Sequence, residues 1–258
     1  LKYKVNNWGT NKDLTERMLR EKRLENITKQ SRLKDVIENL NIEKTEILLK
    51  DRNIDPNFRY DTDNDTLLIL VIGLLDIYEN NNNVRYITRC MEIIQLLLEN
   101  GADPNLSNDD GETPLFWITE TNNIKIVKML LDNGADINKA TNFGTTPLLW
   151  ASKKGDKRMI KLLLEKGANP NLSNDNSETP LLWIIETNNI QIAEILLDNG
   201  ADIDKATNDG TTPLIWASKK GYSEMVKLLL DYGADIGLEN VNGENAYDIA
   251  KNNKIKKI

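Results

Sequence analysis

The sequence repeats at a fixed interval, and this period limits the possible folds more than any other feature. Thr-Pro-Leu occurs four times at steps of 33 residues, at Thr113, Thr146, Thr179 and Thr212. Gly-Ala follows 20 residues after each proline, at Gly134, Gly167, Gly200 and Gly233. A unit of this length cannot bury its apolar face alone, so the period predicts an array of stacked units.

Each unit carries the signals of two short helices. Thr113 can cap a helix with its hydroxyl, and Pro114 suits the first helical position, where its missing N–H would be unpaired anyway. Apolar residues over 124–131 recur at helical spacing and end at Gly134, a residue type suited to a left-handed C-terminal cap. The polar stretch that follows contains Asn142-Phe143-Gly144 and predicts a projecting turn.

These blocks resemble a known family. TPLFWI, TPLLWA, TPLLWI and TPLIWA, together with LLDNGADIN, LLEKGANPN, LLDNGADID and LLDYGADIG, are similar to the ankyrin repeat. The match covers about residues 100–237. The resemblance implies an all-α solenoid of stacked helix-turn-helix units with projecting β-turn hairpins.

The domain prediction extends the array on both sides. We expect an N-terminal helical capping segment at 1–30 and a repeat domain at 31–258, with about six repeats and a partial C-terminal one. Residues 32–57 look like a degenerate first repeat, and about 14 extra residues near 76–88 are polar and read as a loop. The chain begins with Leu1 and stops as its last unit starts a second helix, so we expect the natural protein to continue.

The N-terminal stretch 12–29 has apolar residues among charges and is predicted to be helical. Its apolar residues include Leu14, Met18, Leu24 and Ile27. We interpret this helix as a cover for the exposed core edge of the first repeat. A basic recruitment helix is the alternative.

Two departures from the family pattern stand out. The histidine that usually follows Thr-Pro-Leu is replaced by Phe116, Leu149, Leu182 and Ile215, which favours packing over hydrogen bonds there. Ser177 occupies a turn position that is glycine in the other units, so it is strained if that position needs a positive φ.

A longer period of 66 residues overlies the shorter one, because alternate units are of two types. One type has Ile118 or Ile184 followed by an acidic residue, and the other has Ala151 or Ala217 followed by two lysines. A large residue beside a small one fills a layer, and Glu120 beside Lys153 would form a surface ion pair. The pair of units is therefore predicted to be the self-compatible block. A recent duplication of the pair is the alternative explanation.

The residue inventory excludes most catalytic constellations. The chain has no histidine and one cysteine, Cys90, so histidine triads, cysteine–histidine pairs and zinc sites are excluded within it. Asp61, Asp63 and Asp65 imitate a calcium loop, but Thr66 stands where glycine is required. No glycine-rich phosphate loop occurs. We therefore expect no enzyme activity, no metal and no cofactor.

Charge and hydropathy limit the partners. The net charge of −7 argues against nucleic-acid binding and favours a protein partner with a basic surface. The longest apolar run, 67–75, is too short to span a bilayer. A single cysteine fits a reducing compartment, so we expect the protein in the cytoplasm or nucleus, or in a host cytosol if the source is a pathogen. We also expect a monomer.

The four units share a tryptophan on their first helices, at Trp117, Trp150, Trp183 and Trp216. The family pattern has a buried hydrophobe at this position, which implies a packing role. A partly exposed aromatic groove is the alternative.

The resemblance also implies a function, because ankyrin repeats bind proteins through their turn tips and inner helix face. The implied tip residues are Asp109, Asp110, Glu112, Asn142, Phe143, Thr145, Asp175, Asn176, Glu178, Asn208, Asp209 and Thr211. The implied inner-face residues are Glu120, Thr121, Lys153, Lys154, Glu186, Thr187, Lys219 and Lys220. Each of them could equally be an ordinary solvated side chain.

The sequence thus predicts a noncatalytic protein-interaction scaffold. A host-targeting effector or viral host-range adaptor, whose repeats select a target for a missing C-terminal domain, is the alternative. Two further alternatives are an enzyme that has lost its catalytic domain and a purely structural spacer.

Overall fold

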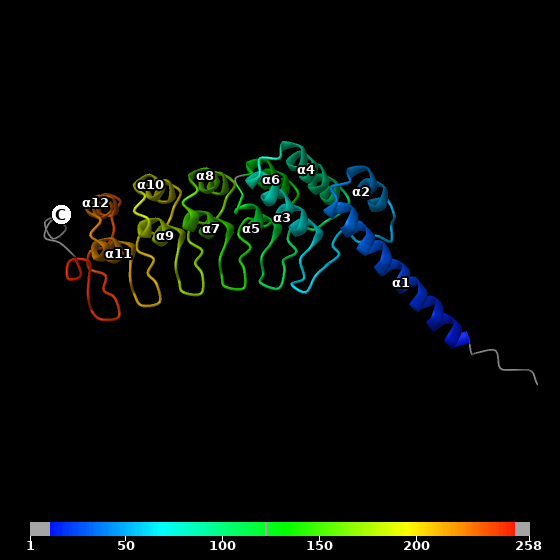
Figure 1. Cartoon of the computed structure of the whole chain (residues 1–258). Coiled ribbons are helices and arrows are strands. Elements are labelled where there is room, and N and C mark those ends of the chain that lie inside the picture. The colour runs from blue at the N-terminus through cyan, green and yellow to red at the C-terminus, as the bar shows by residue number, and fades with distance from the viewer. Residues whose placement is uncertain (1–10, 122, 251–258) are drawn as a thin grey trace, which may run out of the picture. The chain divides into compact units, whose positions relative to one another are not determined.

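The chain forms two compact helical units, Leu1–Ala102 and Asp103–Ile258. The computed structural model describes residues 11–121 and 123–250, with side chains from residue 18 onward. Within these residues all regular structure is helical apart from one isolated antiparallel bridge between Arg59 and Thr66 (Figure 1). The predicted all-α class is confirmed.

The first unit consists of two helix pairs. Helix α1 (Asn11–Glu38) packs on α2 (Ile42–Leu49), and α3 (Leu67–Asn80) packs on α4 (Val84–Glu99). The Asn41 side chain caps α2 by accepting a hydrogen bond from the Lys44 amide at 3.0 Å. The C-terminal half of α1 thus serves as the first helix of the degenerate repeat.

The predicted N-terminal helix is present but longer, and its apolar side chains lie elsewhere than expected. Met18, Leu24 and Ile27 are all more than half exposed, so they do not cover a core edge. Burial begins only near the C-terminal half of α1, where Leu33 and Ile37 are fully enclosed. The side chain of Leu14 lies outside the described residues, and the division at residue 30 stays a prediction.

The extra residues at 76–88 are helical, so the predicted loop is wrong. They lengthen α3 and α4, and only a short turn between Asn80 and Val84 joins the two helices. The Tyr78 and Tyr86 rings pack against each other across this turn, tilted by 37° with centroids 4.7 Å apart. The polar residues of 76–88 belong to the exposed faces of these two helices. The opposite face of α3 is buried, as the fully enclosed Leu75 shows.

The second unit stacks four helix pairs. In chain order these are α5 (Pro114–Ile118), α6 (Ile124–Asp132), α7 (Pro147–Lys154), α8 (Lys157–Glu165), α9 (Pro180–Glu186), α10 (Ile190–Asp198), α11 (Pro213–Lys220) and α12 (Ser223–Asp231). Figure 1 shows the first helices in one row, the second helices in a parallel row, and the connecting turns projecting beyond the first row. The stacking at 33-residue steps agrees with the repeat.

The caps of these helices follow the sequence pattern. The threonine before each proline accepts a hydrogen bond from the amide three residues later, for example from Phe116 to Thr113 at 3.1 Å. The glycine after each second helix has positive φ, such as +88° at Gly134. The turn serine, Ser177, also has positive φ, +59°, where its counterparts are glycines.

Hydrogen bonds between neighbouring repeats hold the stack in register. Asn171 donates to the carbonyl of Gly200 at 2.9 Å and accepts from the amide of Asp202 at 2.6 Å. Asn105 makes the same two contacts one pair of units earlier, with Gly134 and Asp136. The contact with the amide recurs at every 33-residue step, because Asn138 also accepts from the Asn169 amide at 2.9 Å. The donation to a glycine carbonyl is made by Asn105 and Asn171, which are 66 residues apart.

After α12 the chain continues in turns to residue 250, with Ala246 buried where the earlier units have proline. The predicted start of a second helix in this last unit lies outside the described residues. None of the described helices combines the length and the apolar character needed to cross a membrane.

Candidate functional site

The four tryptophans of the second unit form a partly exposed row on its first helices. Trp117, Trp150, Trp183 and Trp216 are each partly accessible, whereas the residues on either side of them in the helix are buried. The proline and the next two residues of each helix face the core, and this leaves the indole at the core's edge. Most of each tryptophan is buried, as the predicted packing role requires, and the remaining exposed part gives the aromatic edge that the alternative describes.

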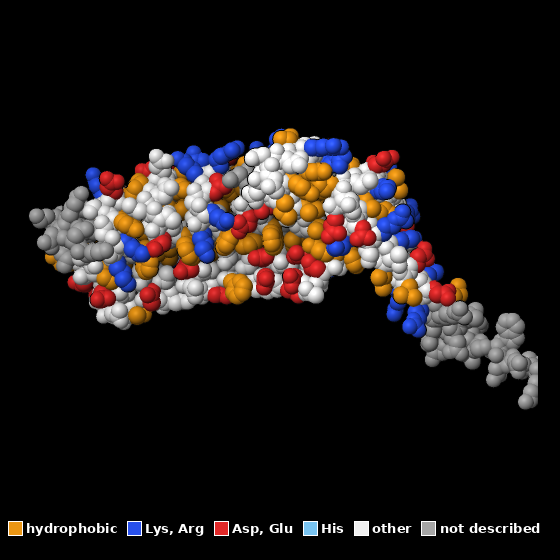
Figure 2. All heavy atoms as spheres, in the orientation of Figure 1, with side chains coloured by type: hydrophobic (Ala, Val, Ile, Leu, Met, Phe, Trp, Pro, Cys, Tyr) orange, Lys and Arg blue, Asp and Glu red, His pale blue; other side chains and the backbone are white. Residues whose placement is uncertain are grey.

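Hydrophobic side chains follow this row of helices, and acidic side chains lie along the turn tips beside them (Figure 2). The indoles also attract cations. The Lys153 ammonium lies 5.1 Å from the Trp150 ring centroid and 4.9 Å from that of Trp183. The Lys220 ammonium lies 5.1 Å from the Trp216 ring. Such distances fall within the range of cation–π attraction.

Acid–base pairs join neighbouring first helices, as the alternation predicts, but through a different lysine. Lys154 contacts Glu120, whereas Lys153 lies over the indoles, so the predicted pair of Glu120 with Lys153 is wrong. The paired unit occurs twice, as a first copy at residues 106–171 and a second copy at residues 172–237. In the second copy Lys220 pairs with Glu186 at 2.7 Å. Both lysines lie over the Trp150 ring, but only Lys154 also reaches the neighbouring acid, a distinction that the sequence alternation alone could not resolve.

Glu186 has a second partner, because the Trp216 Nε1 donates to it at 2.7 Å. Partial burial acts to raise the pKa of Glu186, but the hydrogen bonds from Lys220 and Trp216 together hold it below its usual value. The corresponding indole nitrogen of Trp150 is buried without a hydrogen-bond partner among the described residues. The two copies therefore differ in how the acid engages the aromatic row.

The predicted tip residues lie together along one edge. The Asn142 amide donates to the Asp110 carbonyl at 2.9 Å, and the Asp175 amide donates to the Phe143 carbonyl at 3.2 Å. The Asn208 side chain donates to the Asp175 carbonyl at 3.1 Å. The tips thus form a hydrogen-bonded row whose acidic side chains, and the ring of Phe143, face solvent.

Two predicted site residues are not accessible. Thr211 is only 6% exposed, and the carboxylate of Asp209 accepts a hydrogen bond from its amide at 3.2 Å. Thr121 is buried and donates to the Ile118 carbonyl at 3.1 Å. The remaining predicted residues of both groups are exposed or half-exposed.

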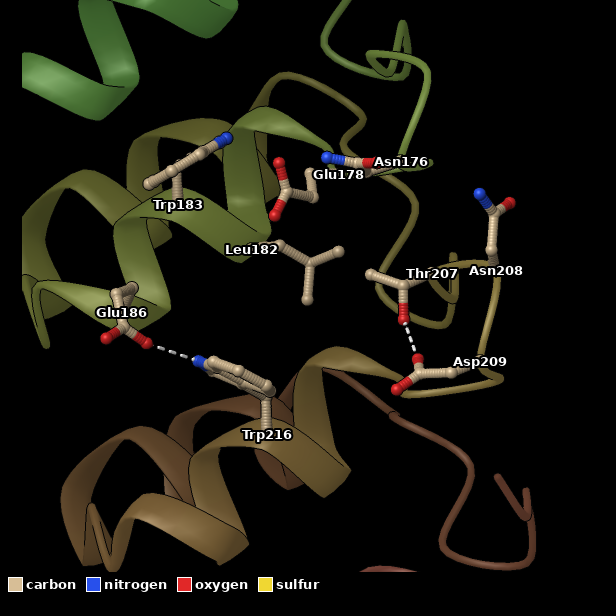
Figure 3. A pocket seen from close by; sticks show the side chains of 9 residues that line it. All are labelled: Asn176, Glu178, Leu182, Trp183, Glu186, Thr207, Asn208, Asp209 and Trp216. Carbon is tan, nitrogen blue, oxygen red and sulfur yellow. Dashed lines mark hydrogen bonds between the residues drawn. The ribbon is translucent and has the colours of Figure 1, made fainter. Parts of the chain in front are cut away.

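A hollow of about 490 Å³ lies between the first helices α9 and α11 and their turn tips (Figure 3). It is lined by Asn176, Glu178, Leu182, Trp183, Glu186, Thr207, Asn208, Asp209 and Trp216. In Figure 3, Leu182 lies between Glu178 and Trp216, and Asp209 lies beside Thr207 at the tip side. The floor is apolar and aromatic, and carboxylates stand around it.

The prediction included five of the nine lining residues and missed Leu182, Trp183, Thr207 and Trp216. The tryptophans were visible in the sequence but were assigned to the core. A difference between the two copies was the other available signal, because Leu182 stands where the first copy has Phe116.

Elsewhere, the acidic cluster of the imitated calcium loop serves the local turn. The Asp61 carboxylate accepts from the Asp65 amide at 2.9 Å, and Arg59 donates to the Asn64 carbonyl at 2.5 Å. In the part of the chain that the structure describes, no group of three or more potential ligand side chains is placed to hold a metal ion. Cys90 is buried, and burial, with a smaller contribution from Glu79, raises the pKa of its thiol to about 12.

Comparisons with known proteins agree with this architecture. A family model described as ankyrin repeats (3 copies) matches residues 84–174 and 155–240. The crystal structure of the ankyrin repeat domain of Bcl-3, described as a unique member of the IkappaB protein family, matches with a TM-score of 0.74. It is 22% identical, over 87% of this chain and 96% of that chain, which concerns the fold alone. A search of curated proteins found no match.

Proposed function

Because the chain belongs to the ankyrin repeat family, we propose that it is a noncatalytic scaffold that binds a partner protein through the second unit. Ankyrin repeats generally mediate protein–protein interaction and are typically noncatalytic. The proposed surface is the row of first helices together with the turn tips. Its partner presents a basic face, because the exposed tip side chains include Asp109, Asp110 and Asp175.

The observation that carries this proposal is the partly exposed tryptophan row. Tryptophan is enriched among the residues that dominate binding energy, and it offers a large rigid surface at low entropic cost. Four such side chains lie at 33-residue steps on successive first helices, and the pairs of Glu120 with Lys154 and of Glu186 with Lys220 lie beside them. The backs of the second helices carry no comparable aromatic row among the described residues.

The test is affinity capture with surface variants of the full chain. A variant with Trp150→Ala and Trp216→Ala should lose the captured partner, which would be identified by mass spectrometry. A control with Lys161→Ala and Lys227→Ala changes two exposed residues on α8 and α12 and should retain it. Circular dichroism would confirm that both variants stay folded. Loss of the partner in the control alone would place the interface on the second helices and refute the proposal.

A further inference from the structure

The hollow between α9 and α11 differs from its counterpart in the first copy at the residues that decide its shape. Leu182 corresponds to Phe116, and Asp209 corresponds to Phe143, at the 66-residue step. In the first copy the Phe116 ring fills space beside Trp150, with centroids 5.6 Å apart. In the second copy the smaller Leu182 stands at this position, and the hollow lies beside it and Trp216.

The same two substitutions change the charge of the opening. Asp209 adds a carboxylate at the position where Phe143 carries a ring, and the hydroxyl of Thr207 donates to it. That contact, together with hydrogen bonds from Thr211, holds the pKa of Asp209 below its usual value. Glu178 and Glu186 line the same hollow, so three carboxylates surround two indoles and a leucine.

Part of this negative charge is already compensated. Lys220 and Trp216 occupy the Glu186 carboxylate, and Asn174 donates to Glu178 at 2.7 Å. Lys219 and Lys220 lie over Trp216, and Lys153 on α7 lies over Trp183, whereas the hollow lies between α9 and α11. Thr207 and Thr211 both donate to Oδ1 of Asp209. The side of Trp183 that lines the hollow and Oδ2 of Asp209 thus remain for a ligand.

We propose that this hollow is a binding site for an arginine side chain on an extended segment of the partner protein. A guanidinium is planar, weakly hydrated and able to stack on an indole while it donates to carboxylates. Its methylene stem suits the apolar floor formed by Leu182 and the indoles. A lysine ammonium is compact and strongly hydrated, so it loses more on entering a mostly apolar hollow.

This inference rests on the proposed protein-binding function and names the chemistry that the partner brings to one position. It also means that the two copies of the paired unit present different surfaces to the partner. The first copy keeps the ring of Phe116 inside and exposes that of Phe143, so it offers an apolar contact. The second copy offers an acidic hollow, and a single partner segment lying along the row would meet the two surfaces in sequence.

The experiment uses the full ¹⁵N-labelled chain and capped alanine–glycine peptides with a central arginine, lysine or norleucine. Binding is followed through the tryptophan indole NMR signals, assigned with single Trp→Phe variants. The arginine peptide should shift the Trp183 and Trp216 signals saturably, with an affinity about tenfold above that of the lysine peptide. The norleucine peptide should not saturate. Equal binding by all three peptides, or no saturable shift, would overturn the proposal.

Variants place the site. Leu182→Phe copies the ring of the first copy into the hollow and should abolish binding, and Asp209→Asn should weaken it about tenfold through the lost charge. The turn tolerates this second change, because Phe143 occupies the same position in the first copy. Glu194→Gln removes the same charge from an exposed residue of α10, away from the hollow and from the proposed surface, and should bind normally. Unchanged binding in Asp209→Asn, whatever Leu182→Phe does, contradicts the assignment.

A gain of binding is the complementary test. The double variant Phe116→Leu with Phe143→Asp gives the first copy both residues of the second, so the arginine peptide should then also shift the Trp150 signal. Failure of that gain means the two positions do not create the site. If the peptides do not bind while the paired tryptophan variant still loses its captured partner, the arginine site is wrong and the protein-binding function stands. If the peptides bind but the paired tryptophan variant keeps its captured partner, the proposed partner-binding surface is refuted and the arginine site is not.

Discussion

At the scale of single residues, the two copies of the paired unit differ most in what they present to solvent. The Phe143 ring is 66% exposed at a turn tip, although its backbone is held by the neighbouring tip. The ring therefore lies in solvent and does not fold back onto the adjacent turns. An exposed ring that contributes little to folding is available for a partner.

Phe143→Asp introduces the residue found at the equivalent position of the second copy, Asp209. It should weaken binding of the captured partner by about 1–3 kcal/mol. The free energy of unfolding should change by less than about 0.5 kcal/mol, because the ring is largely in solvent. Titration calorimetry and thermal melting of the same samples measure both quantities. A melting temperature lowered by several degrees with unchanged affinity would show that the ring is structural.

The contact of Glu186 with Lys220 and Trp216 predicts a pH dependence. The pKa of Glu186 is below its usual value in the folded protein, so ionised Glu186 stabilises the fold above its unfolded pKa. That contribution is lost as the pH falls through the folded pKa. Glu186→Gln should therefore melt below wild type at neutral pH, and the difference should vanish in acid. A difference that persists or grows in acid would contradict this assignment.

At the scale of elements, the turn tips and the layers between helices set the register of the stack. A Cβ atom added at Gly144 would lie 2.9 Å from the Asn174 Cα of the next tip, whereas at Gly134 nothing lies within 4 Å. Both glycines have positive φ, +74° and +88°. The tip glycine therefore combines a backbone requirement with close approach of another repeat.

Gly144→Ala should destabilise the protein more than Gly134→Ala. Each substitution incurs roughly 1–2 kcal/mol for a left-handed backbone, and only the first also forces neighbouring backbone apart. Urea denaturation of the two variants beside wild type measures the difference. Equal losses of stability would mean that the tips separate freely and that the close approach is not part of the stack's cohesion.

The layer prediction concerns Ile184 and Ala217, which are both fully buried on successive first helices. Ala217→Ile alone should cost roughly 1–3 kcal/mol by overpacking. Exchanging the two residues should cost less than the sum of the single changes, because the exchange restores the total volume. Denaturant melts of the two single variants and the exchange complete the cycle. Strict additivity would refute the paired unit as a packing block and favour a recent duplication.

At the scale of the whole molecule, the single thiol and the tryptophan row report on different units. Cys90 is buried in α4 of the first unit, and four of the tryptophans belong to the second. In repeat proteins each element depends mainly on its neighbours, so a local defect does not weaken all regions equally. The two probes can therefore follow the units separately.

Leu163→Ala removes a fully buried side chain from α8 and should destabilise the second unit by about 2–5 kcal/mol. The denaturant midpoint of the tryptophan signal should fall by more than that of Cys90 labelling by a thiol reagent. In native conditions Cys90 should stay unlabelled, because burial keeps it protonated with a pKa of about 12. Equal shifts of both midpoints would mean that the two units unfold as one cooperative block.

Local chemistry determined most of the architecture. The Thr-Pro starts, the glycine ends and the 33-residue step place the eight helices of the second unit, because caps and periodicity act within a few residues of the chain. The family resemblance rests on the same local signals. The positive φ of Ser177 also followed from its position, since the other repeats use glycine there.

Only the tertiary structure decided how side chains on those helices are shared between core, surface and hollow. Trp117 and its counterparts lie at the edge of the core, and Lys154 rather than Lys153 reaches the neighbouring acid. The polar residues of 76–88 extend two helices instead of forming a loop. Each of these outcomes depends on which face the adjacent helix covers. Contacts between elements, and not the composition of one element, set that choice.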